Sequence, residues 1–101
     1  MIKVGILEAA SATGAEIVRI LLNHPDIELT WAQSSVAQGP LPSAIRGIAG
    51  ECRLAFCRQP AEPVDVVLNC SPVPVSPDLL SRIASDPATV RVIETAADDV
   101  P

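Results

Sequence analysis

The sequence predicts an α/β fold in which an open, mostly parallel sheet of about five strands carries helices on both faces. Lys3–Leu7 is a short apolar run of the kind that forms a buried parallel strand. Residues 15–24 then place Ile17, Val18 and Leu21 on one face of a helix. The composition agrees, because one Phe, one Trp and no Tyr leave an aliphatic core, which suits a parallel sheet covered by helices.

The remaining elements follow from alternating apolar residues and from helix-start signals. Alternation of Ile27, Leu29 and Trp31 predicts the second strand, over 27–33. Ser76 before Pro77 is a typical helix start, and this helix should end near residues 86–87. Further strands are expected over 52–57, 64–70 and 90–94. The 101 residues then form a single Rossmann-like domain, 1–101, with strand order 3-2-1-4-5.

The turn between the first strand and the first helix, Glu8–Gly14, should face any ligand. A dinucleotide-binding turn uses glycines so that the pyrophosphate can approach the backbone. Ser11, Ala12, Thr13 and Gly14 are the residues expected at that pyrophosphate. Glu8 stands where the first glycine belongs, and its charge about 5 Å from a phosphate would cost roughly 1 to 3 kcal/mol.

The same turn contains a helix-start signal. Thr13 followed by Glu16 predicts a capping box, in which each side chain accepts a hydrogen bond from a free backbone N–H. Capping alone is one interpretation of these two residues. Capping together with a phosphate contact is the other, because the N-terminus of a helix attracts anions.

Two more groups of residues follow strands and should lie at the same edge of the sheet. Ser34 and Ser35 follow the second strand, where a dinucleotide-binding domain contacts the adenosine ribose, although they also suit a solvated loop. The absence of an acid there favours NADP over NAD. Cys70, Ser71 and Pro72 follow the fourth strand, where the nicotinamide would lie.

Cys70 is expected to be a buried structural thiol, and no catalytic residue is predicted. The single histidine, His24, lies at the far end of the first helix, roughly 15 Å from the turn, so Cys70 has no base to activate it. Three cysteines without a Cys-x-x-Cys pair predict neither disulfides nor a metal site.

Charge and hydropathy narrow the classes of partner. A formal charge of −5, with seven Lys and Arg spread along the chain, argues against a nucleic-acid surface. The amino terminus shows no signal pattern, and no apolar run reaches the roughly 18 residues of a membrane span. The expectation is a cytoplasmic protein without membrane contact.

The sequence resembles a known family along nearly its whole length. Residues 2–7, Thr13–Glu16 and Leu21–Leu29 are similar to the amino-terminal segment of N-acetyl-γ-glutamyl-phosphate reductase, in the semialdehyde dehydrogenase superfamily. Residues 64–67 and 90–94 follow in the expected order. The resemblance implies that this chain is the NADP-binding domain of an oxidoreductase. That enzyme acts in arginine biosynthesis and reduces an acyl phosphate to a semialdehyde. In that family the catalytic cysteine lies in a second domain.

Two hypotheses of different class remain open at this point. One is a dinucleotide-binding domain that a separate catalytic domain or chain completes. The other is a non-catalytic module whose exposed sheet edge serves protein–protein contact, with Glu8 as its best support. Either hypothesis predicts a homo-oligomer or a partner chain, because an open sheet edge favours association. A regulatory module that binds an uncharged ligand is a third possibility.

Overall fold

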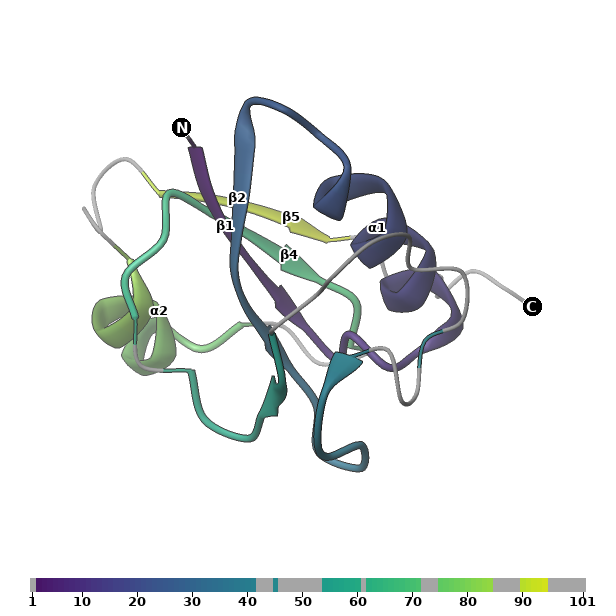
Figure 1. Cartoon of the computed structure of the whole chain (residues 1–101). Helices are drawn as coiled ribbons and strands as arrows, with labels where there is room; N and C mark the ends of the chain where they lie inside the picture. Colours follow the sequence, from purple (N-terminus) through teal and green to yellow (C-terminus); the bar gives the residue numbers. More distant parts are fainter. Residues whose placement is uncertain are drawn as a thin grey trace.

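A computed structural model describes residues 2–41, 45, 54–60, 62–71, 75–84 and 90–94. In these residues the strands form one five-stranded sheet of order β3-β2-β1-β4-β5, and every neighbouring pair is parallel. Helix α1 lies on one side of the sheet and α2 on the other (Figure 1). The predicted fold class and strand order are confirmed.

The element bounds differ from the predicted ones mainly at the ends. The first helix begins three residues earlier than predicted, and the second ends at Ile83 rather than near residues 86–87, which lie outside the described residues. The third strand has only two residues. The elements are β1 (Ile2–Leu7), α1 (Ala12–Leu22), β2 (Ile27–Gln33), β3 (Phe56–Cys57), β4 (Val66–Asn69), α2 (Pro77–Ile83) and β5 (Arg91–Glu94).

Strand β1 forms the centre of the sheet and aligns the carboxyl ends of its neighbours. Ile6 lies beside Ala32 of β2, and Leu7 lies beside Asn69 of β4. Gln33, the last residue of β2, lies beside Cys57 of β3. Because all these strands run in the same direction, the residues that follow them meet at one edge of the sheet.

The core has two layers, one on each face of the sheet. On the α1 face, Val18 and Leu21 pack with sheet residues that include Val4 and Ile6. On the α2 face, Ile83 packs with Leu7, Trp31, Val64 and Val67. Aliphatic side chains form most of both layers, as the composition predicted. Neither described helix is long and apolar enough to cross a membrane.

Trp31 fixes the spacing between β2 and β1 on the α2 face. It is the register partner of Gly5, and its side chain is 5 % exposed. The indole Nε1–H donates to the carbonyl of Glu62 at 3.0 Å, which orients the ring. The benzo ring fills the space that a Cβ at position 5 would need. Gly5 is therefore required by packing.

Gly5→Ala is expected to destabilise the domain by about 1 to 3 kcal/mol, because the added methyl group overpacks against a ring with a fixed orientation. The free energy of unfolding from urea denaturation measures the effect. Trp31→Leu removes the ring, so Gly5→Ala should cost much less in that background. Equal costs in both backgrounds would contradict the proposed contact.

Candidate functional site

Glu8 follows directly after β1 and has an unusual backbone conformation. Its φ is 56°, and it is the only non-glycine residue with positive φ among the described residues. Glycine adopts this conformation at little cost, whereas a residue with a side chain is strained in it. The structure therefore agrees with the inference that Glu8 stands where a dinucleotide-binding turn has its first glycine.

Hydrogen bonds hold Glu8 against the carboxyl end of β2. Its backbone N–H donates to Oε1 of Gln33 at 2.9 Å, and the N–H of Ala9 donates to the Gln33 carbonyl at 2.8 Å. The hydroxyl of Ser35 donates to the Glu8 carboxylate at 2.9 Å. A carboxylate from the β1 turn thus lies at the end of β2, where the sequence alone shows only neutral residues.

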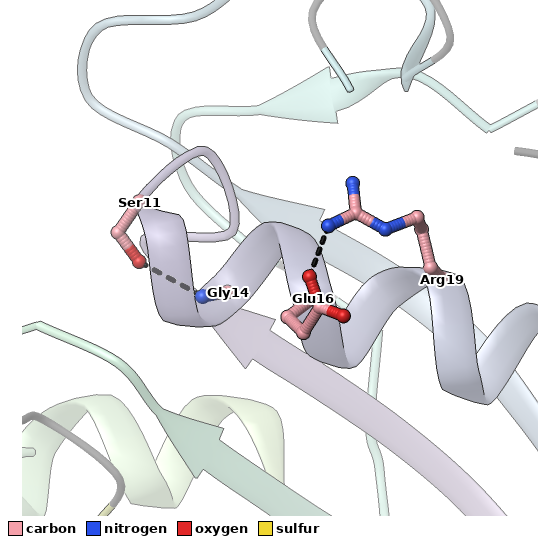
Figure 2. Close-up of polar contacts among 4 residues, drawn as sticks. All are labelled: Ser11, Gly14, Glu16 and Arg19. Atoms are coloured by element: carbon pink, nitrogen blue, oxygen red, sulfur yellow. Dashed lines mark hydrogen bonds and ion pairs between the residues drawn. The ribbon is translucent and has the colours of Figure 1, made fainter. Parts of the chain in front are cut away.

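Ser11, rather than Thr13, is the N-cap of α1. Its hydroxyl accepts a hydrogen bond from the N–H of Gly14 at 3.0 Å (Figure 2). Glu16 pairs with Arg19 one turn further along the helix (Figure 2). The predicted capping box of Thr13 and Glu16 is therefore wrong. Serine and threonine both cap helices well, so residue type alone left two possible start positions.

The position of Gly14 is fixed by contact with the preceding turn. A Cβ on Gly14 would lie 2.6 Å from the Glu8 carbonyl oxygen and 2.8 Å from Cα of Ala9. Glycine at this position lets the helix pack closely against the strand end, which is a role of the last glycine in dinucleotide-binding turns. The N–H groups of Ala12 and Thr13, in the first turn of the helix, have no intrahelical acceptor and can bind an anion.

The two serines after β2 have different environments. Ser34 is fully buried, and its hydroxyl accepts hydrogen bonds from the N–H groups of Val36 and Ala37 at 3.2 and 2.9 Å. It therefore stabilises the loop. Ser35 is exposed and is bound to Glu8. The structure places Ser35, more than Ser34, where a ligand can contact it.

The residues after β4 lie beside the end of β1, as expected. The N–H of Cys70 donates to the Leu7 carbonyl at 3.1 Å, and Cys70 is buried. The N–H of Ser71 donates to Oδ1 of the buried Asn69 at 3.0 Å. Cys70 is confirmed as a buried residue, and Pro72 lies outside the described residues.

Within the described residues, His, Cys, Asp and Glu side chains form no cluster that could hold a metal ion. Burial raises the pKa of the Cys57 thiol, which outweighs the opposite effect of a hydrogen bond with its own backbone. A raised pKa keeps the thiol protonated at neutral pH, and only the thiolate is a strong nucleophile. Cys57 therefore lacks the environment of a catalytic cysteine, and Cys70 is buried.

A cleft of about 590 Å³ opens at the carboxyl edge of the sheet, on the α2 side. The last residues of β1 and β2 line it, together with residues that follow β1, β3 and β4 and with residues of α2. Among them are Glu8, Gln33, Arg58, Ser71, Leu79 and Arg82. Of the predicted site residues that the structure describes, Ser71 lines the cleft, whereas the predicted residues after β1 and β2 do not; Glu8 and Gln33 line it at those two strand ends.

Arg58 and Arg82 are the lining residues that the sequence analysis missed. Arg58 follows β3, and its carbonyl accepts a hydrogen bond from Nε2 of Gln33 at 3.3 Å. Arg82 lies on α2, and neither arginine forms an ion pair within the part of the chain that the structure describes. The position of Arg58 directly after a predicted parallel strand was the available signal.

Comparison with known proteins agrees with this architecture. Residues 3–99 match the family described as "Semialdehyde dehydrogenase, NAD binding domain". The chain belongs to this family. A solved aspartate semialdehyde dehydrogenase with NADP from Candida albicans superposes with a TM-score of 0.60 at 18% identity, covering 95% of this chain and 30% of that one. At that identity the superposition supports the fold alone.

Similar sequences carry the name N-acetyl-gamma-glutamyl-phosphate reductase. One from Bacteroides fragilis is 40% identical over 73 residues, which is 70% of this semialdehyde dehydrogenase-type domain and 23% of the relative. One from Herminiimonas arsenicoxydans is 37% identical over 106 residues, covering 97% of this chain and 29% of the relative. The chain therefore spans less than a third of the length of these relatives.

Ser11→Ala is expected to lower the free energy of unfolding by about 1 kcal/mol, because it removes the N-cap of α1. Thr13→Ala is the matched control and should change stability little, since Thr13 lies inside the first helical turn. Urea denaturation of both variants tests the assignment. A larger loss from Thr13→Ala than from Ser11→Ala would contradict it.

Proposed function

We propose that the cleft binds a nicotinamide adenine dinucleotide. The observation that carries this proposal is its position: it lies where the carboxyl ends of β1 and β4 meet, between connections that leave on opposite faces of the sheet. In open α/β sheets, ligands bind in the crevice at this point. Membership of a family of NAD-binding domains supports the same conclusion.

Residues in the cleft and beside it, at the same edge of the sheet, would contact the parts of such a ligand. Ser71 lines the cleft, whereas Ala12, Thr13 and Ser35 lie outside its lining. The first-turn N–H groups of Ala12 and Thr13 would hold the pyrophosphate. Ser35, after β2, would contact the adenosine ribose, and Ser71, after β4, would lie near the nicotinamide. Hydride transfer is the chemistry that the bound nicotinamide would supply. The chain itself would bind and orient the cofactor.

The charges of the cleft are mixed. Glu8 opposes a pyrophosphate, whereas Arg58 and Arg82 attract one. The guanidinium groups belong to exposed residues, so water and salt weaken their attraction for a pyrophosphate. We therefore expect weaker binding than in a turn with three glycines.

The finer function that we propose is that of the relatives' amino-terminal domain. This chain would hold the cofactor for reduction of an acyl phosphate to a semialdehyde, as in N-acetyl-γ-glutamyl-phosphate reductase, and NADP(H) is the form that the family resemblance implies. Catalytic residues would come from a further domain or from a partner chain, because burial raises the pKa of the Cys57 thiol and Cys70 is buried. Isolated, the chain is expected to show no reductase activity.

An interaction module is the second candidate function. One observation favours it: Ile93 on the edge strand β5 is 48 % exposed. A sheet edge with apolar side chains pairs readily with another chain. In this alternative the strained turn at Glu8 does not bind a nucleotide. The domain instead forms a homo-oligomer or binds a partner through β5.

Ser71→Trp is expected to abolish dinucleotide binding, because the indole would fill the cleft beside the end of β1. Isothermal titration calorimetry with NADH and with NADPH measures the affinity, and the parent should bind at least one of them saturably. Ser81→Trp is the matched control, since Ser81 is exposed on α2 and outside the cleft. This variant should bind as the parent does.

If the unmodified chain bound neither NADH nor NADPH, the result would refute the dinucleotide proposal and favour the interaction module. Binding by Ser71→Trp with the affinity of the parent would refute the location of the site. Thermal unfolding followed by circular dichroism shows whether each variant is folded.

A further inference from the structure

An acidic side chain from the turn after β1, that of Glu8, lies beside the end of β2. The residues that follow β2 in the sequence do not predict it. In dinucleotide-binding sheets an acid at this strand end accepts a hydrogen bond from the ribose 2′-hydroxyl of NAD, whereas a cation nearby accommodates the 2′-phosphate of NADP. The residues that follow β2 here are neutral. Glu8, which is 25 residues earlier than Gln33, supplies a carboxylate to the same place.

The carboxylate of Glu8 already makes the hydrogen bond that a ribose hydroxyl would make. The Ser35 hydroxyl donates to its Oε2 at 2.9 Å. A ribose 2′-hydroxyl is the same kind of donor and could replace or join Ser35. A 2′-phosphate has no proton to donate when fully ionised, and it would bring two negative charges beside a third.

The position of this carboxylate is well determined by its neighbours. The backbone of Glu8 is bound to the side chain of Gln33, and the backbone of Ala9 is bound to the Gln33 carbonyl. Glu8 is half-buried and lines the cleft. The hydrogen bond between its carboxylate and Ser35 is exposed, so salt screens the effect of the carboxylate on a nearby phosphate, and this effect should be largest at low ionic strength.

We propose that Glu8 is a specificity-determining residue that makes the cleft prefer NAD(H) to NADP(H). The proposal rests on the proposed dinucleotide site, and it reverses the choice of cofactor that the family resemblance implies. Glu8 takes the role of the acid at the end of β2, although it belongs to the turn after β1.

Arg58 is the cation that acts against this preference. Its backbone lies next to Gln33, level with the residues that follow β2. Its side chain is exposed, so water and salt weaken its attraction for a 2′-phosphate. Glu8 is less exposed and is bound directly to the strand-end hydroxyl of Ser35, and for these reasons its repulsion should exceed the attraction of Arg58.

The test compares the affinities of NADH and NADPH, measured by calorimetry on the parent chain and on Glu8→Gln. The parent should bind NADH about tenfold more tightly than NADPH, which corresponds to a difference of about 1.4 kcal/mol. Glu8→Gln keeps the size and one oxygen that can accept a hydrogen bond but removes the charge, so NADPH should gain affinity and the ratio should approach one. Glu28→Gln, on the exposed start of β2, removes the same charge away from the cleft and should leave the ratio unchanged.

Adenosine 5′-diphosphate and its 2′-phosphorylated form provide a second measurement on the parent alone, which does not depend on the folding of any variant. The unphosphorylated ribose should bind more tightly. Equal or tighter binding of the 2′-phosphorylated ligands would overturn the proposal, as would an unchanged ratio in folded Glu8→Gln. If no nucleotide binds to the parent or to any variant, the proposed dinucleotide site fails first, and this proposal fails with it.

Discussion

The contact between Gly14 and the backbone of the preceding turn is the constraint on which the site depends. A Cβ at position 14 would collide with the Glu8 carbonyl oxygen and with Ala9, so α1 approaches the end of β1 as closely as a helix can. That approach places the cap of Ser11 and the first-turn N–H groups at the carboxyl edge of the sheet. The hydrogen bonds from Glu8 and Ala9 to Gln33 then join this turn to β2.

The fold was predictable because the signals for it are local and strong. The apolar run at the start of β1 and the aliphatic composition indicated a parallel sheet, and its strand order is confirmed. The start of α1 was not predictable from residue type, because Ser11 and Thr13 are both good caps. The packing of Gly14 against the turn decides between them, and that contact depends on the path of the backbone.

The candidate site was predictable only in outline. The ends of β1, β2 and β4 meet as expected, yet Ser34 uses its hydroxyl within its own loop, whereas Ser35 reaches Glu8. Arg58 joins the cleft through β3, a strand of two residues. Such details depend on register and on side-chain direction. A sequence pattern specifies neither of them for short strands.

Glu8 combines two opposite effects at the place where a dinucleotide-binding turn has its first glycine. Its positive φ is strained for a residue with a side chain, and its charge would oppose a pyrophosphate at the turn. The same residue brings a carboxylate to the end of β2, where it can accept a hydrogen bond from a ribose hydroxyl. The substitution is therefore consistent with a changed cofactor preference, and loss of the cofactor is not the only explanation for it.

The most direct test of this account is a titration of the ¹⁵N-labelled chain with NADH, followed by two-dimensional ¹H–¹⁵N NMR. The account predicts chemical-shift changes at the amides of Ala9, Ala12, Thr13 and Ser71, which border the carboxyl edge of the sheet. The amides of Lys3 and Glu28, at the opposite ends of β1 and β2, should not move. Shifts confined to the opposite edge or to β5, or no shifts at millimolar NADH, would contradict the claim that this cleft is a dinucleotide site.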